Sequence, residues 1–293
     1  MKYRKLGQSS LSVSEISFGC MSLDVHAPES IKLLQSAFDA GINFFDTADL
    51  YDKGENELLV GKALNDVRDQ IIIATKVGNK LRKDGSGWDW NPTKEYILSA
   101  VENSLRQLNT DYIDLYQLHG GTIEDPIDET IEAFEILKKQ GKIREYGISS
   151  IRPNVIREWV EKSKMATVMM QYSFLDRRPE EEALELLHQN GISVITRGSL
   201  AKGLLVDKPP KDYLNYTAKK VELLQSNLQE TGHPLSYAID FVLQHPAVAS
   251  AVLGMRTKEQ LELNLTAFDA KTDLQIIDQL KKILPQNKYD KHR

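Results

Sequence analysis

Four polar side chains occur at or just beyond the ends of three apolar segments that the pattern predicts to be consecutive strands. Asp46 and Tyr51 belong to INFFDTADLY, Lys76 ends IIIATK, and His119 ends YQLH. A carboxylate, a phenol, an ammonium and an imidazole at one edge of a sheet can bind a polar group and exchange protons with it. Because an unpaired buried charge costs several kcal/mol, we expect Asp46 and Lys76 to neutralise each other across neighbouring strands.

Apolar segments with the length and composition of buried strands recur along the whole chain. They begin near Ile16, Ile42, Ile71, Ile113, Ile143, Ala166, Ser193 and Val248. Amphipathic stretches of helical spacing separate them, and Gly41, Gly141 and Gly191 stand where a helix is expected to stop. Eight strand–helix units in 293 residues favour a closed (β/α)8 TIM barrel over an open doubly wound sheet. We therefore expect an α/β protein with one domain over residues 1–293.

Four segments fall outside this repeat. YRKLGQSSLSVS opens the chain and predicts a hairpin, while TDLQIIDQLKKIL near the end predicts an additional helix. Two long insertions, GNKLRKDGSGWDWNP and AKGLLVDKPPKDYLNY, follow the third and seventh expected strands. Both leave the carboxyl ends of strands, which is the face where barrel enzymes build their sites. Long loops at that face are usually functional or mobile.

Composition narrows the classes of function. The 37 basic and 42 acidic side chains leave a formal charge of −5, so the chain lacks the basic excess of a nucleic-acid binder. No apolar run approaches the ~20 residues of a membrane span. The single cysteine, Cys20, and the absence of HExxH predict no disulfide and no metal site. Without GxGxxG or a P-loop motif, a dinucleotide would have to bind on the barrel rim. We expect a cytoplasmic protein that acts on a small molecule.

The chain resembles the aldo-keto reductases over nearly its whole length. The resemblance rests on GINFFDTADLY followed by ENELLVGKAL, on ATK, SLRQLNTDYIDLYQLH, KIREYGIS and QYS, and on the late GMRTKEQLELN. It implies reduction of a carbonyl group by NADPH on a TIM barrel, with the cofactor extended across the rim. It also identifies Asp46, Tyr51, Lys76 and His119 as the catalytic tetrad of the family.

Elementary chemistry is consistent with these roles. Reduction of an aldehyde requires a hydride and a proton for the developing alkoxide, and Tyr51 is the implied proton donor. We expect Lys76 to lower the pKa of Tyr51 from ~10 by about 3 units, and Asp46 to keep Lys76 charged. His119 would donate a hydrogen bond to the carbonyl oxygen. By resemblance, Asp46 also contacts the nicotinamide ribose.

The resemblance assigns further residues to the cofactor. Ser149, Ser150 and Gln171 correspond to contacts with the nicotinamide carboxamide, although Ser150 stands where relatives more often carry Asn. Arg197 replaces an aromatic residue that commonly stacks on the nicotinamide, and a guanidinium can also stack on a ring. The remaining implied contacts near the cofactor are Cys20, Met21, Gly198, Ser199, Leu200, Lys202 and Gly254.

The segment LGMRTKEQLELN predicts a capped helix start. Thr257 and Gln260 have the spacing of a capping box, and such a helix end binds phosphate through its free N–H groups. With Arg256 and Lys258 beside it, the expected ligand is the 2′-phosphate of NADPH. Gln260 and Asn264 would contact the adenine, as in relatives. The alternative for Arg256 and Lys258 is ordinary surface charge.

Trp88 and Trp90 lie in the first long insertion. Exposed indoles are costly, so we expect both to cover a cofactor, a substrate or a partner, and we assign them to the substrate. Packing inside the loop is the alternative. Two other functions are open at this point: an NADPH-binding interaction module like the potassium-channel β-subunits, and a sugar or inositol dehydrogenase that works in the oxidative direction. The carbonyl substrate and the oligomeric state are not specified by the sequence.

Overall fold

The computed structural model describes all 293 residues. Eight parallel strands close into a barrel in the order β3-β4-β5-β8-β9-β10-β11-β12, with β12 paired back to β3. They are β3 (Ile16–Gly19), β4 (Phe44–Asp46), β5 (Ile72–Val77), β8 (Ile113–Leu118), β9 (Ile143–Ser149), β10 (Thr167–Gln171), β11 (Ser193–Arg197) and β12 (Val248–Gly254). The predicted (β/α)8 barrel is therefore confirmed.

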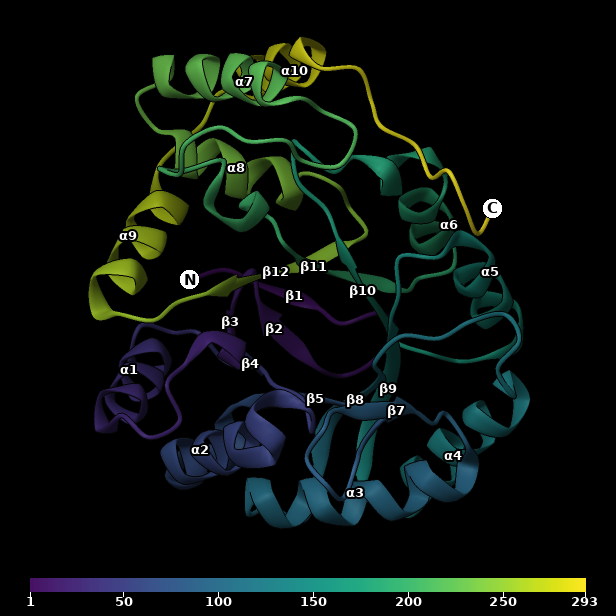
Figure 1. The fold of residues 1–293 in the computed structure, drawn as a ribbon. Coiled ribbons are helices and arrows are strands. Elements are labelled where there is room, and N and C mark those ends of the chain that lie inside the picture. The colour runs from purple at the N-terminus through teal and green to yellow at the C-terminus, as the bar shows by residue number, and fades with distance from the viewer.

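Helices surround the barrel (Figure 1). They are α1 (Pro28–Asp39), α2 (Glu55–Leu64), α3 (Lys94–Leu108), α4 (Ile127–Lys139), α5 (Pro153–Lys162), α6 (Ala183–Gln189), α7 (Ala218–Glu230), α8 (Pro234–Leu243), α9 (Lys258–Asp269) and α10 (Leu274–Ile283). Short 3-10 helices are η1 (Cys20–Ser22), η2 (Tyr51–Gly54), η3 (Asn65–Gln70), η4 (Arg178–Glu181) and η5 (Ala201–Gly203). Gly41, Gly141 and Gly191 follow α1, α4 and α6 with positive φ, as expected where a helix ends. No helix is both long and apolar enough to cross a membrane.

Two apolar cores hold this arrangement. The larger one lies where the helices pack on the strands, and Phe134 and Trp159 are among its fully buried members. The smaller one combines strand residues such as Phe44, Leu115 and Ile195 with residues of the N-terminal segment. That segment is the predicted hairpin, formed by the antiparallel strands β1 (Tyr3–Lys5) and β2 (Ser12–Ser14).

The two insertions take shapes that periodicity could not indicate. The first contains a second hairpin, β6 (Asn79–Leu81) paired with β7 (Trp88–Trp90). The second contains η5 and a bridge between Tyr213 and Tyr216, and it leads into α7. α10 packs against α7, so the additional C-terminal helix covers the side of the barrel where the second insertion ends (Figure 1).

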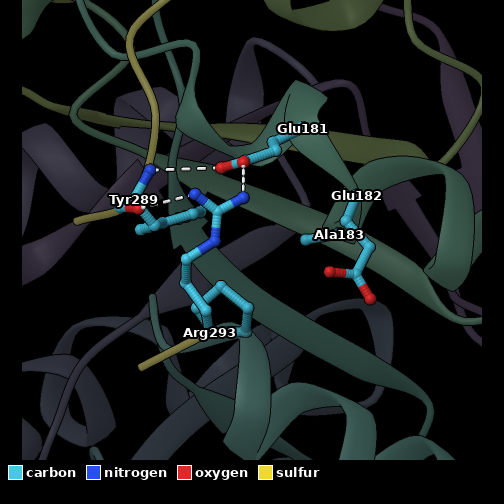
Figure 2. Close-up of a pocket in the computed structure, with 6 residues that line it drawn as sticks. Glu181, Glu182, Ala183, Tyr289 and Arg293 are labelled. Carbon is cyan, nitrogen blue, oxygen red and sulfur yellow. Dashed lines mark hydrogen bonds and ion pairs between the residues drawn. The ribbon is translucent and has the colours of Figure 1, made fainter. Parts of the chain in front are cut away.

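The C-terminal tail ends beside α5 and α6 (Figure 1), and Figure 2 shows its contacts with Glu181. Glu181 accepts hydrogen bonds from the Tyr289 backbone N–H and from the Arg293 guanidinium. Together with Pro153 and Ala183 these residues line a small pocket. Glu181 pairs with Arg293, and Glu182, which also lines the pocket, pairs with Arg157 outside it. Every charged group of this pocket therefore has an ion-pair partner, so the pocket is not a candidate for catalysis.

Candidate active site

Polar residues lie at the ends of five of the eight barrel strands. They are Asp46 on β4, Lys76 near the end of β5, Ser149 on β9, Gln171 on β10 and Arg197 on β11. The register places Gly19 beside Asp46 and Gln171 beside Arg197. His119 follows β8 directly, and its backbone N–H donates to the Val77 carbonyl at 2.8 Å. The parallel topology therefore gathers these side chains at one rim.

Lys76 is the centre of the hydrogen-bond network. Its side chain is 1 % exposed, and its Nζ lies 2.8 Å from each carboxylate oxygen of Asp46. The ammonium also donates to the Thr47 carbonyl oxygen at 2.6 Å and lies 3.4 Å from the Tyr51 hydroxyl. Burial lowers the pKa of Lys76, but Asp46 and Tyr51 more than offset this, so the net pKa is raised and Lys76 remains charged. The expected pairing of Asp46 with Lys76 is confirmed.

The pKa of Tyr51 differs from the sequence-based expectation. Burial raises it, the Lys76 ammonium lowers it by a smaller amount, and the nearby Asp46 carboxylate raises it again. The net pKa lies above the ordinary value, so the expected fall toward neutrality is wrong for this structure. The reason is that removal of the phenolate from water outweighs an ammonium that is itself neutralised by Asp46. Tyr51 is consequently a protonated donor at neutral pH.

His119 shares this location with Tyr51. Their rings meet edge to face, with centroids 5.9 Å apart. Burial, with Lys76 and Arg197 nearby, lowers the pKa of His119 to about 3. The imidazole is therefore neutral at physiological pH and carries one N–H donor. Its Nδ1 is buried and has no hydrogen-bond partner in the protein.

Arg197 is a largely buried cation at the same rim. Burial lowers the pKa of its guanidinium, and Tyr51, Asp46 and Asp176 raise it only through their charge rather than through hydrogen bonds. Gly198, the next residue, has φ +66°, and a Cβ there would meet the Gln171 side chain at 3.7 Å. The guanidinium is thus close to Tyr51 without being bonded to it.

The other residues that the sequence predicts to bind the cofactor differ in how far they are exposed to solvent. Cys20, Ser149, Ser150, Ser199 and Asn264 are buried, Gln171 and Leu200 are partly buried, and Met21, Gly198, Lys202, Gly254, Arg256, Thr257 and Gln260 are exposed. The Cys20 thiol has a raised pKa, chiefly because of burial, so it is not a reactive thiolate.

The start of α9 has the predicted capping box. Thr257 Oγ1 accepts from the Gln260 N–H at 3.3 Å, and Gln260 Oε1 accepts from the Arg256 N–H at 2.8 Å. Gln260 is therefore used by the helix cap. The Lys258 ammonium lies 3.7 Å from Glu262, one turn along the same helix. The Arg256 side chain is exposed and has no ion-pair partner, which leaves it available to a ligand.

The two tryptophans of the first insertion are placed differently. Trp88 is 48 % exposed on β7. Trp90 is half-buried and donates its indole N–H to Asp125 at 3.0 Å. Trp88 remains a candidate substrate contact, whereas Trp90 has partners within the protein.

Two groups at the site carried no usable sequence signal. The Lys76 ammonium donates to the backbone carbonyl of Thr47. Every residue type has such a carbonyl, so the sequence could not indicate this contact. Thr47 also binds Asn56 through its hydroxyl at 2.7 Å, and Asn56 donates to the Cys20 carbonyl at 2.9 Å. Asn56 lies in ENELLVGKAL, a motif that carries the family resemblance but does not indicate a role for its individual residues.

Comparisons with known proteins agree with this geometry. The model of the Aldo/keto reductase family matches residues 15–285. An uncharacterized oxidoreductase, YqkF of Bacillus subtilis, is 50% identical over 283 residues and covers 92% of each chain. The holo form of the aldo-keto reductase AKR11C1 from Bacillus halodurans has a TM-score of 0.97 and 49% identity, covering 100% of this chain and 99% of that one. An NADH-specific methylglyoxal reductase of Escherichia coli is 29% identical and covers 92% of this chain and 94% of its own.

Proposed function

The chain belongs to the aldo/keto reductase family, and on that premise we propose that it reduces aldehydes, and some ketones, to alcohols with NADPH. The observation that carries the proposal is the chain of contacts from Asp46 through Lys76 to the Tyr51 hydroxyl, at 2.8 and 3.4 Å. A partly buried phenol beside a buried ammonium is suited to giving up one proton to a reacting oxygen.

Tyr51 is the proposed general acid. Its raised pKa keeps the proton on the phenol until a stronger base, the developing alkoxide, is next to it. When the proton leaves, the Lys76 ammonium is within reach of the resulting phenolate. Asp46 and the Thr47 carbonyl keep that ammonium charged and fixed. The Lys76 charge therefore stabilises the state in which Tyr51 has lost its proton.

His119 is the proposed hydrogen-bond donor to the carbonyl oxygen. Its low pKa makes it a neutral donor, which orients the oxygen without competing with Tyr51 as an acid. The edge-to-face contact between the two rings brings both donors to one location. Trp88, exposed on the neighbouring hairpin, is the proposed substrate contact outside this centre.

The residues present fit a nicotinamide dinucleotide that supplies the hydride when it is bound. Arg197 has no hydrogen-bonded partner of its own and can stack on or pair with such a ligand. Ser149, Ser150 and Gln171 would hold the nicotinamide end, together with the backbone near Cys20 and Met21. Two features favour NADPH over NADH, namely the exposed Arg256 side chain and the positive end of the α9 helix dipole beside it.

Steady-state turnover with both cofactors tests the proposal. Purified protein is mixed with NADPH or NADH and with a panel of short, long and aromatic aldehydes, and loss of reduced nicotinamide is followed. We expect aldehyde-dependent oxidation with a preference for NADPH. Binding of NADPH without turnover of any aldehyde would refute the reductase proposal and favour a binding module. A preference for NADH, as the name of the Escherichia coli relative states for that protein, would refute only the cofactor assignment.

A further inference from the structure

The His119 imidazole has no hydrogen bond that fixes its orientation. A functional histidine usually binds a carboxylate or a carbonyl through its second ring nitrogen, and this bond sets the ring plane. In this chain His119 Nδ1 is buried without a partner. The ring can be held only by packing and by the backbone that carries it, which is bonded to Val77 on one side and continues into Gly120 on the other.

The Trp90 ring packs against this backbone. A Cβ on Gly78 would lie 2.6 Å from Trp90 Cζ3, and a Cβ on Gly120 would lie 3.5 Å from the same ring edge. Both glycines have positive φ, +121° and +141°. Gly78 follows β5 and Gly120 follows His119, so one indole covers the points where both catalytic strands leave the barrel. The Asn91 N–H, next to Trp90, donates to the Gly78 carbonyl at 2.7 Å.

A second connection leads from the indole nitrogen to the loop after β8. Trp90 Nε1 donates to Asp125 Oδ1 at 3.0 Å, and Asp125 Oδ2 accepts from the Thr122 N–H at 2.6 Å. Arg152 also donates to the Gly121 carbonyl at 2.7 Å. Residues 120–122 are thus contacted by Trp90, Asp125 and Arg152.

We propose that Trp90 is a positioning residue for His119, acting through the backbone of Gly120 and through Asp125, and that it does not contribute mainly as a substrate contact. The inference rests on the proposed reductase function, because it concerns how His119 meets the carbonyl oxygen. A displacement of a catalytic group by about 1 Å can cost about 100-fold in rate. Loss of the ring beneath Gly120 removes a packing surface for which the protein has no substitute at that point.

A double-mutant cycle on kcat tests the proposal with Trp90→Ala, His119→Ala and the double variant. If Trp90 acts through His119, Trp90→Ala lowers kcat about tenfold or more in the wild type but less than about twofold in the His119→Ala background. Equal losses in both backgrounds would overturn the proposal, because they would show a contribution independent of His119. No loss in the wild type would also overturn it. Trp90→Phe, which keeps a ring at this position, is expected to restore most of kcat.

Asp125→Ala is the second variant, and it keeps the cycle informative if Trp90→Ala does not fold. It removes the acceptor of the indole N–H while leaving the ring in place, and it should show the same dependence on His119 with a smaller loss. Arg82→Ala is the matched control, because it breaks only the exposed Arg82–Asp89 ion pair of the same hairpin and should leave kcat unchanged. NADPH affinity should not change in any of these variants. A wild-type protein without activity would refute the reductase function, whereas an active wild type with additive losses would refute only the role of Trp90.

Discussion

Lys76→Met removes the ammonium that contacts the Asp46 carboxylate, the Thr47 carbonyl and the Tyr51 hydroxyl in the candidate site. In the folded protein Lys76 is 1 % exposed and contacts both oxygens of Asp46 and the Thr47 carbonyl. The substitution leaves a carboxylate that is 5% exposed without a cation and a backbone carbonyl without its donor. Removal of one partner from a buried ion pair costs about 3–5 kcal/mol, so we expect the free energy of unfolding to fall by this amount near neutral pH.

The loss should depend on pH and on Asp46. Burial already raises the pKa of Asp46, and Lys76 is the main group that lowers it. Without Lys76 the folded pKa rises further above the unfolded value, so the variant is least stable at high pH and recovers as acidification protonates Asp46. The double variant Asp46→Asn/Lys76→Met has no buried unpaired charge and should be more stable than Lys76→Met alone.

Urea unfolding of the wild type, the two single variants and the double variant at two pH values measures these free energies. The expected coupling between positions 46 and 76 is more than about 1 kcal/mol near neutral pH. Losses that add to within about 0.5 kcal/mol, or a Lys76→Met loss that does not change with pH, would refute the assignment of Lys76 and Asp46 as a mutually dependent pair.

Three further predictions follow from other residues. Burial raises the pKa of Glu57 to about 7. The free energy of unfolding therefore falls as the pH rises from the pKa that Glu57 has in the unfolded chain through this value. Glu57→Gln should therefore stabilise the protein by up to about 3 kcal/mol near pH 8 and by nothing near about pH 4, as measured by denaturant unfolding. The His119 ring signals in NMR should not titrate between about pH 5 and 8, and a midpoint near about 6.5 would contradict the burial of this ring. Arg256→Ala should weaken NADPH binding roughly 10–150-fold and leave NADH binding nearly unchanged, and equal effects on both would exclude Arg256 as the phosphate ligand.

Much of the fold could be predicted because the barrel repeats one local pattern. Buried parallel strands read as short apolar runs, and all eight were recognisable from such runs between amphipathic helices. The β6–β7 hairpin was not recognisable, because NKL and WDW are too short and too polar to show a period. The presence of two helices, α7 and α8, before β12 also could not be predicted, because a strand–helix repeat leads us to expect one helix between β11 and β12.

The residue types predicted which side chains belong to the candidate site. They did not predict whether burial or the nearby charges would dominate the pKa of Tyr51. Strand ends identified Asp46, Lys76 and His119, and pairing of the first two followed from the cost of an isolated buried charge. The direction of the Tyr51 pKa depends on how deeply the phenol is buried, which spacing does not encode. The role of Trp90 depends on its contact with Gly78, at the start of the same insertion, and with Gly120, in the loop after β8, and these contacts exist only after folding.

The turnover of Tyr51→Phe with NADPH and an aldehyde that the wild type reduces tests whether Tyr51 donates the proton. General acid catalysis contributes about 10²–10⁴-fold, and Tyr51 is not among the residues proposed to hold the dinucleotide. We expect a fall in kcat of at least about 100-fold with NADPH affinity nearly unchanged. A variant that keeps more than about a tenth of the wild-type kcat would contradict the assignment of Tyr51 as the proton donor.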